Sequence, residues 1–224
     1  MRRVIVVCEG QTEEAFVSRL LTPAFLPLNM HIQGITVQTS PGHKGGALNY
    51  DRLLPTLRNA LAGGSVAAVS TFIDLYKLDT GFPGFDAAAP LALQHRLDAL
   101  ENALHADVVG QCGCDPARFV PHIQPHEFEA LLFSDVQTLI GVEAGWDSAL
   151  LPLLAARAVV ATPEDINHGP ATKPAAQLGA LLQRPNFRKV RHGPIAAERI
   201  GLARIEAECP RFALWLTRLR ALIF

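Results

Sequence analysis

The sequence predicts an α/β fold in which a mainly parallel, four-stranded sheet is flanked by helices, with a helical extension at the carboxyl end. Two continuous apolar runs, 4–8 and 65–73, have the character of strands buried on both faces. Helical patterns alternate with strand patterns up to residue 124, which favours right-handed crossovers and parallel pairing. Beyond Pro125 only helical patterns follow.

The length and composition are those of one compact unit. The chain has 224 residues, of which 49% are hydrophobic and 18% charged, so it can bury a sizeable core and is not mainly disordered. We expect residues 1–135 to form the α/β core. Residues 136–224 are expected to form the helical extension, packed on that core.

The individual elements follow from apolar periodicity and from turn residues. The apolar pattern and the Thr12 cap predict a helix over 12–21, with Glu13 and Glu14 near its positive end. Trp146 and Trp215 lie in apolar helical patterns and are expected in the core. The other expected strands are 31–39 and 119–124, and the other expected helices are 47–61, 90–105, 135–141, 148–157, 175–183 and 212–222.

Charge and cysteine content restrict the partners and the compartment. Twenty basic and twenty-one acidic residues give a formal net charge of −1, so a polyanion would have to be held by a local patch. The four cysteines fit no disulfide framework, and Cys112-Gly113-Cys114 lacks the second pair of a zinc site. The apolar run at 4–8 is too short for a signal peptide, and no run reaches membrane-spanning length. We expect a cytoplasmic protein that does not contact membranes.

Acidic residues follow the ends of three predicted strands. Glu9, Asp74 and Glu127 each lie at or just after such an end. Because the carboxyl ends of parallel strands meet at one edge, these side chains are expected to converge there. Carboxylates that converge in this way suit a hard cation such as Mg²⁺ or Mn²⁺, and Glu13 is placed to add a ligand. Alternatively, each acid is a solvated strand-end or helix-cap residue.

The acidic pattern also carries a resemblance to a known family. Val-Cys-Glu-Gly-Gln-Thr-Glu at 7–13 resembles the first-strand signature of Toprim-type domains, especially those of OLD-type nucleases. Together with the segments 72–78, 125–133, 163–167 and 209–216, it resembles a Toprim-like bacterial family called domain of unknown function 4276 over nearly the whole chain. The resemblance implies a Rossmann-like sheet of order 3-2-1-4, with strands three and four on opposite sides of strand one.

The resemblance further implies a chemistry. Toprim domains use a Glu after strand one and an Asp-x-Asp pair after strand three to hold Mg²⁺ and act on phosphodiesters. Glu9, Glu13 and Asp74 match that pattern, but Tyr76 stands where the second Asp would be. Tyr76 either donates a hydrogen bond to a phosphate or metal-bound water, or packs over the sheet edge as a structural residue.

The expected activity is that of a divalent-metal-dependent nuclease or related phosphodiesterase, in bacterial defence by family analogy. The expected catalytic residues are Glu9, Asp74 and Glu127, with Glu9 as candidate general base. Glu127 and Glu129 would supply the charge missing at Tyr76. The expected metal ligands are Glu9, Glu13, Asp74, Glu127 and Glu129. His126 is expected beside these acids or as a satisfied core residue.

Four cations are candidates for binding nucleic-acid phosphates. Lys44 lies in the glycine-rich stretch 40–46, which lacks Walker A spacing, and Arg188 and Lys189 lie in the basic stretch 184–192. Lys173 lies near the position where the family usually shows a Ser-Lys-Arg run, which this chain lacks. Each of these residues also fits an ordinary loop or surface position.

Two other functions stay open. One is a non-catalytic module that docks on an ATPase partner, which would tolerate Glu9→Gln. The other is a hydrolase of small phosphoesters, which would favour a closed pocket over an open basic groove. The sequence does not choose between DNA and RNA.

Overall fold

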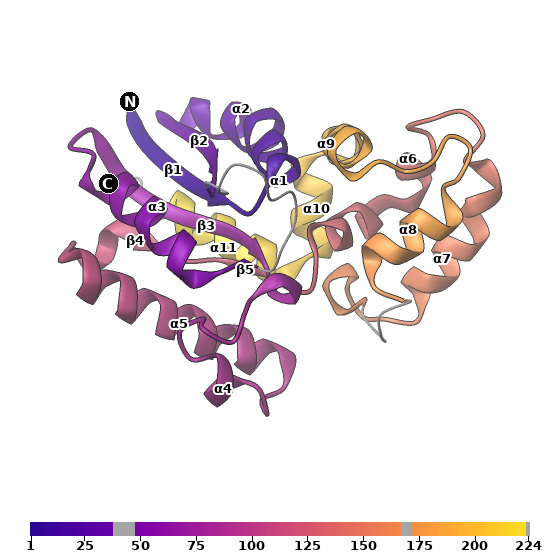
Figure 1. The fold of residues 1–224 in the computed structure, drawn as a ribbon. Helices are drawn as coiled ribbons and strands as arrows, with labels where there is room; N and C mark the ends of the chain where they lie inside the picture. Colours follow the sequence, from indigo (N-terminus) through magenta and orange to yellow (C-terminus); the bar gives the residue numbers. More distant parts are fainter. Residues whose placement is uncertain (38–47, 167–171, 223–224) are drawn as a thin grey trace.

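A computed structural model describes residues 1–37, 48–166 and 172–222. It shows a mixed α/β fold with one five-stranded parallel sheet in the order β2-β1-β3-β4, in which β5 also pairs with β3 (Figure 1). The strands are β1 (Arg2–Cys8), β2 (Met30–Thr36), β3 (Val66–Asp74), β4 (Phe119–Val120) and β5 (Ile123–Gln124).

Helices flank the sheet and make up most of the carboxyl-terminal part. The α-helices are α1 (Gln11–Phe16), α2 (Thr22–Phe25), α3 (Tyr50–Ala62), α4 (Phe85–Ala88), α5 (Leu93–Cys112), α6 (Val136–Ile140), α7 (Leu150–Ala158), α8 (Pro174–Leu181), α9 (Lys189–Ile200), α10 (Leu202–Glu208) and α11 (Pro210–Arg220). A π-helical turn, Val17–Leu21, joins α1 to α2. The 3-10 helices are Leu26–Leu28, Leu75–Lys77, Pro116–Arg118, Phe128–Asp135, Asp147–Ala149 and Pro163–Asp165.

The strand order differs from the expected 3-2-1-4. Strand β1 lies between β2 and β3, with Val6 opposite Gly34 on one side and Ser70 on the other. Strands β4 and β5 lie beyond β3, so the third and fourth predicted strands are on the same side of β1. The physical reason is burial, because β1 and β3 are apolar on both faces whereas most of β2 is only half-buried and suits an edge.

The strand predicted at 119–124 is two short pieces rather than one. Pro121 has no backbone N–H to donate to β3, and the residue after it pairs with a side chain. The N–H of His122 donates to Oγ1 of Thr71, and that hydroxyl donates to the His122 carbonyl oxygen, each at 2.8 Å. Pairing with β3 resumes at Ile123.

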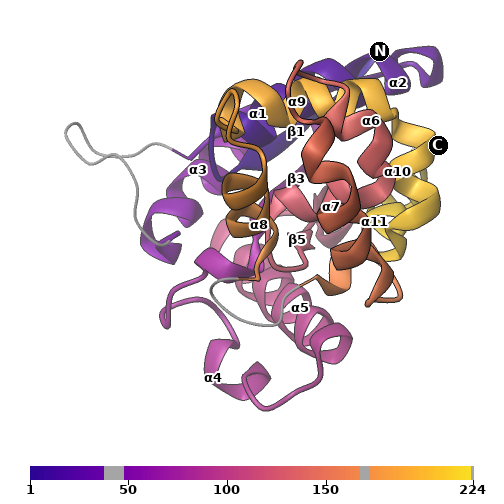
Figure 2. The same ribbon diagram turned by 90° about the vertical axis from the view of Figure 1, so that its right-hand side faces the viewer.

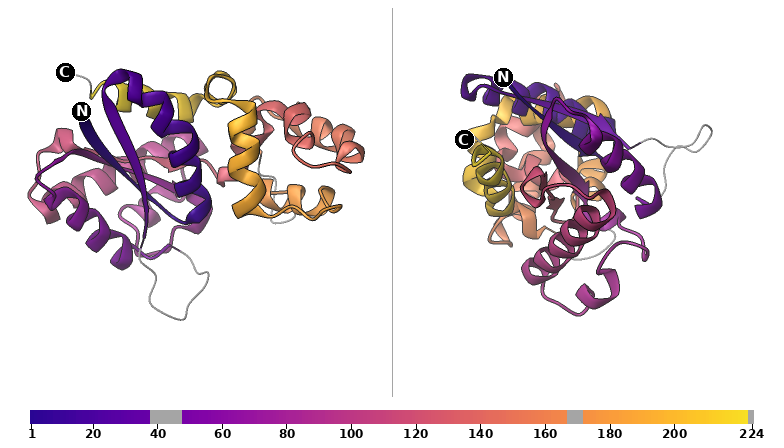
Figure 3. Two further views of the ribbon diagram at one scale, coloured as in Figure 1. Left: turned by 90° about the horizontal axis from the view of Figure 1, so that it is seen from above. Right: turned by 90° about the vertical axis from the view of Figure 1, so that its left-hand side faces the viewer.

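Alternate residues of β1 face two separate apolar clusters. Val4, Val6 and Cys8 pack with residues of α1, α2, α9 and α11 on one face of the sheet. Ile5 and Val7 pack with residues of α3 and α5 on the other face. The sheet is therefore the middle of three layers, as Figures 1 and 3 show.

The carboxyl-terminal helices form two groups. Helices α6, α7 and α8 gather at one end of the molecule, which faces the viewer in Figure 2, whereas α11 lies along the sheet (Figure 1). Trp215 of α11 donates from Nε1 to Oγ of Ser70 at 2.8 Å and stacks on His122 with ring centroids 4.5 Å apart. Trp215 and Trp146 are both buried, which confirms their predicted place in the core. Across the described ranges, no helix is both long and apolar enough to cross a bilayer.

Helix α9 is not among the predicted helices, because Gly193 and Pro194, two residue types that disfavour helix interiors, lie within it. The glycine is required by close packing. A Cβ atom at Gly193 would lie 3.1 Å from the Phe128 ring and 3.2 Å from the Thr12 methyl group. The amino-terminal half of α9 therefore packs closely against α1 and the 3-10 helix Phe128–Asp135.

A buried ion-pair network joins α5 to α11. The Glu101 carboxylate lies 2.8 Å from Nη2 of Arg211 and 2.8 Å from Nη2 of Arg218, and it accepts the N–H of Ile123 at 2.9 Å. Burial alone would raise the pKa of Glu101, but His122, Arg211 and Arg218 outweigh it and lower the pKa to about 2. The carboxylate therefore stays ionised at neutral pH.

We expect Glu101→Gln to lower the free energy of unfolding by about 3 kcal/mol at neutral pH, because it removes a buried counter-charge of two arginines. The folded-state pKa lies below the unfolded value of about 4.3, so this contribution is present above that pH and is lost as the pH falls through 2. Urea unfolding measures the difference. Glu198→Gln, which alters an exposed pair with Arg19, is the control and should change stability by less than about 1 kcal/mol.

Candidate functional site

The carboxyl edge of the sheet brings two predicted acids together. Glu9 follows β1 and Asp74 ends β3, and these strands are neighbours. Oε2 of Glu9 accepts the N–H of Asp74 at 3.4 Å. The strand order reverses between β1 and β3, since β2 lies to one side of β1 and β3 to the other. In open α/β sheets, ligands bind outside the carboxyl ends of the strands at such a reversal.

Three further contacts centre on Lys189, the first residue of α9. Its Nζ lies 3.3 Å from Oε1 of Glu13, 3.6 Å from Oδ2 of Asp74 and 3.3 Å from Oε1 of Glu129. The side chains of these three acids are at most 3% exposed. One ammonium group is thus surrounded by three buried carboxylates from three separate segments.

Each carboxylate of this group is placed by a different element. Glu13 comes from the first turn of α1, directly after β1. Asp74 is fixed by the N–H of Phe128, which donates to its Oδ1 at 2.8 Å. Glu129 lies in the first turn of the 3-10 helix that follows β5. The chain enters this helix through His126, whose φ of 59° is in the left-handed region that non-glycine residues rarely adopt.

The remaining two acids have lysines of their own. Oε1 of Glu9 lies 3.0 Å from Nζ of Lys77, and Oε1 of Glu127 lies 2.9 Å from Nζ of Lys173. Oε2 of Glu127 also accepts the N–H of Ala175 at 3.0 Å, in the first turn of α8, where the helix dipole favours an anion. Five carboxylates therefore share three ammonium groups, which leaves an excess of negative charge at the edge.

The five acids at this edge are called the acidic cluster below. Burial and mutual repulsion raise the pKa of two of its members, Asp74 and Glu129. Burial raises the pKa of Asp74 well above its ordinary value, and Glu13, Glu9 and Glu129 add to the rise while Lys189 opposes it. Burial likewise raises the pKa of Glu129, again against Lys189. Burial lowers the pKa of Lys189, but Asp74, Glu129 and Glu13 outweigh it and hold that pKa above its ordinary value. The lysine is therefore charged at every physiological pH.

Four carboxylate oxygens of the cluster lack a hydrogen-bond donor. They are Oε1 of Glu13, Oδ2 of Asp74 and both side-chain oxygens of Glu129, all buried and without a hydrogen bond from the described residues. All but Oε2 of Glu129 face the Lys189 ammonium as ion-pair partners instead. Buried oxygens of this kind are costly without a cation. In the described part of the chain, however, no three Asp, Glu, His or Cys side chains are grouped so that they could hold a metal ion. The oxygen donors are of the type that a hard divalent cation prefers, but around the Lys189 ammonium they are not arranged as a metal site.

The other predicted residues lie in different surroundings. Tyr76 is 44% exposed, and its ring centroid is 4.6 Å from Nζ of Lys173. The carbonyl oxygen of His126 accepts the N–H of Tyr76 at 3.1 Å, which ties the two segments together. Arg188 is exposed, and its N–H donates to Nδ1 of His192. Lys44 lies outside the described residues.

The roles of the lysines were the part that sequence reasoning missed. Lys173 and Lys189, which are predicted to bind phosphates, also pair with carboxylates at the sheet edge, a contact that the sequence does not indicate. Lys77 is not among the predicted site residues, although its position three residues after Asp74, in the turn that follows β3, is a signal that could identify it. No pattern indicated Lys189 as the central cation, because that placement depends on α9.

We expect Lys189→Met to lower the free energy of unfolding by about 2 kcal/mol near pH 8, less than for a fully buried pair because 35% of the lysine side chain is exposed. The deficit should shrink near pH 5.5. Asp74 and Glu129 have raised pKa values, which rise further without the lysine, so the folded state takes up protons that the unfolded state does not.

Urea unfolding at the two pH values measures this difference. Arg191→Met, on the same helix with a 60% exposed side chain, is the control. A deficit of equal size at both pH values would contradict the proposed electrostatic origin.

Comparison with known proteins adds a family to this geometry. A family model described as "Domain of unknown function (DUF4276)" matches residues 8–220, a span that contains all five carboxylates and all three lysines of the cluster. No curated protein and no solved structure matches the chain. The chain therefore belongs to the family named domain of unknown function 4276.

Proposed function

We propose that this protein is a divalent-metal-dependent phosphodiester hydrolase that acts on nucleic acid. The observation that carries the proposal is the set of three buried carboxylates at the sheet edge, from Glu13, Asp74 and Glu129, which share one lysine and whose oxygens lack full hydrogen bonding among the described residues. A protein gains little stability by burying such a set, because the desolvation of each charge is only partly repaid by one shared lysine. Clusters of buried ionisable groups with shifted pKa values are typical of functional sites.

Mg²⁺ or Mn²⁺ is the cofactor that suits these oxygen donors. Glu13, Asp74 and Glu129 would hold it after a regrouping of their side chains, because around Lys189 they are not arranged as metal ligands. Glu9 and Glu127 lie at the margin of the same edge. When bound, such an ion polarises phosphoryl oxygens and lowers the pKa of a water molecule. Lys189 contacts oxygens of all three acids, so a cation bound to them would have to displace the Lys189 ammonium.

The chain's own residues supply the remaining functions. The Glu9 side chain is 14% exposed, against 5% or less for the other four acids, and it is the carboxylate placed to accept a proton from solvent or substrate. The side chains of Lys77, Lys173 and Lys189 are 26–39% exposed, so each ammonium is positioned to contact a phosphate oxygen at the mouth of the site.

A Toprim relationship is a finer proposal. The Glu-Gly-Gln-Thr-Glu turn at 9–13 supports it, since both glutamates belong to the cluster. The order β2-β1-β3-β4 and the exposed Tyr76 are departures from the expected pattern. An ATPase partner and a role in bacterial defence are likewise proposals, which rest on that resemblance.

Metal binding should be measurable without any substrate. We expect millimolar Mn²⁺ or Mg²⁺ to raise the melting temperature by about 5 °C, since a ligand held by the folded state alone stabilises it. Asp74→Asn should abolish the rise, because it removes a buried ligand charge. Glu164→Gln, which alters a buried carboxyl outside the cluster, should keep it. An unchanged melting temperature for the wild type would weaken the metal assignment.

Cleavage assays test the activity itself. Single- and double-stranded DNA, total RNA and tRNA are incubated with Mn²⁺, Mg²⁺ or EDTA. We expect metal-dependent cleavage of at least one substrate, and a loss of about 100-fold or more in Glu9→Gln and Asp74→Asn. Glu164→Gln again serves as the matched control.

The outcomes separate the competing functions. Cleavage that needs the metal and both acids establishes the hydrolase and identifies its substrate. Absence of cleavage together with absence of metal binding would contradict the proposal and favour a docking module. Cleavage of small phosphoesters alone would replace nucleic acid as the substrate class.

A further inference from the structure

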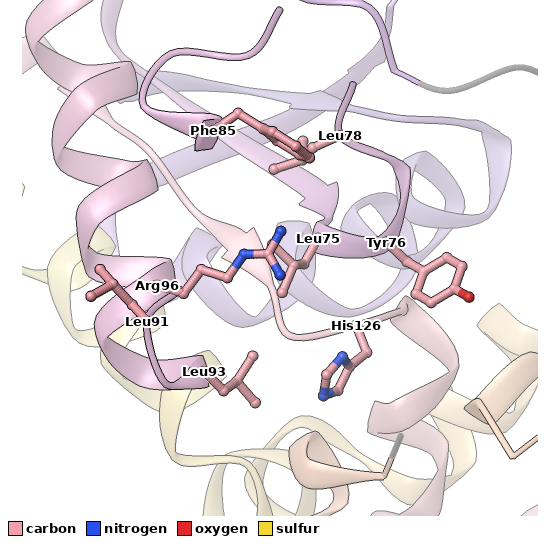
Figure 4. Close-up of a pocket in the computed structure, with 8 residues that line it drawn as sticks. All are labelled: Leu75, Tyr76, Leu78, Phe85, Leu91, Leu93, Arg96 and His126. Carbon is pink, nitrogen blue, oxygen red and sulfur yellow. The ribbon is translucent and has the colours of Figure 1, made fainter. Parts of the chain in front are cut away.

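A cavity of about 390 Å³ lies beside the acidic cluster and is not part of it. Its lining residues are Leu75, Tyr76, Leu78, Phe85, Leu91, Leu93, Arg96 and His126, shown in Figure 4. The volume is within the range of pockets that bind small molecules. Leu75 and Tyr76 follow Asp74 directly in the chain, and His126 directly precedes Glu127. The cavity and the cluster are therefore built on the same two chain segments.

The side chains that line the cavity are mostly apolar, with few polar groups. Five of the eight residues are leucine or phenylalanine, and they make up the apolar part of the wall, on several sides of the Arg96 guanidinium (Figure 4). Tyr76 and Leu91 are 44% and 42% exposed. A flat ring that enters the cavity past these two exposed residues would be removed from water on several sides.

Arg96 is a charged residue in this mostly apolar lining. It projects from the first turn of α5 into the cavity toward Leu75, while the Tyr76 ring points away from it (Figure 4). Its Nε is buried and has no hydrogen-bond partner within the described ranges. The Arg96 guanidinium lies over the Phe85 ring, with Cζ 5.7 Å from the ring centroid.

A buried guanidinium nitrogen without an acceptor is costly, so it indicates a missing acceptor. Guanidinium groups present parallel N–H donors in one plane, which match two adjacent acceptors on a planar ligand. Among the purines, guanine has such a pair in O6 and N7, whereas adenine has a donor beside N7.

We propose that this cavity is a nucleobase-binding site with a preference for guanine. The base lies against the wall formed by Leu75, Phe85 and Leu93, and Arg96 donates to O6 and N7. The sugar-phosphate then extends past Tyr76 and His126 toward Glu9 and Asp74. The choice of a nucleotide rests on the proposed function, because the neighbouring cluster is assigned to phosphodiester chemistry.

Ligand-observed NMR titrations of the 224-residue chain in EDTA test the binding without turnover. The probes are GMP, AMP, ribose 5-phosphate and inorganic phosphate. We expect GMP to bind at least tenfold more tightly than the other three, the discrimination typical of one bidentate arginine contact. Comparable binding of ribose 5-phosphate or phosphate would overturn the proposal, because Arg96 would then be reading an anion rather than a base.

Variants assign the binding to this cavity. Arg96→Met keeps the aliphatic stem and should weaken GMP binding about tenfold without lowering the melting temperature, since it removes an unpaired donor. Leu91→Trp fills the mouth and should weaken GMP binding with Arg96 intact. Arg52→Met, at an exposed position of α3, is the control. GMP affinity that is unchanged in both cavity variants would overturn the proposal.

The two proposals fail in distinguishable ways. If GMP binds through Arg96 but no substrate is cleaved, the cavity assignment stands and the hydrolase assignment is wrong. If cleavage depends on Glu9 and Asp74 but GMP does not bind, the hydrolase assignment stands and the nucleobase site is wrong.

Discussion

Excess negative charge buried at the carboxyl edge of the sheet is the constraint on which the rest of the structure depends. Glu13, Asp74 and Glu129 are almost completely withdrawn from water, and they share Lys189. Without that ammonium group, the carboxylates would have to take up protons or open to solvent. The position of α9, which carries the lysine, is therefore tied to the chemistry of the edge as well as to the core.

The packing of α9 shows how the fold meets this constraint. Gly193 lets the helix approach Phe128 and Thr12 more closely than a side chain would permit. Phe128 in turn donates its N–H to Asp74. The same close contact thus positions the lysine, one of the acids it neutralises and the turn from which Glu129 projects.

Other segments that suggested the family resemblance have structural roles. Glu164 is buried, and its two oxygens accept the N–H groups of Arg211 and Phe212 at the start of α11. This contact satisfies donors that a helix leaves free at its amino end. It anchors α11, whose Trp215 bonds to Ser70 in the middle of the sheet. The segments 163–166 and 209–216 therefore stabilise the core, whereas 7–13, 72–78 and 125–133 contribute the residues of the candidate site.

Much of the fold and part of the site were determined by the sequence alone. Continuous apolar runs determined β1 and β3, because strands buried on both faces need no polar alternation. Acids that follow such strands must meet at one edge of a parallel sheet, which brought Glu9 and Asp74 together. The family assignment likewise followed from motifs spread over the chain.

Only the tertiary structure decided the strand order, the position of Lys189 and the cavity around Arg96. The strand order depends on which strand can expose side chains to solvent. Most side chains of β2 are only half-buried, so β2 suits the edge of the sheet. Lys189 and Arg96 reach their places on helices far from the acids in sequence, and no local pattern encodes which buried group a long side chain will meet. Contacts between distant segments are set by packing, so they could be seen only once the segments were assembled.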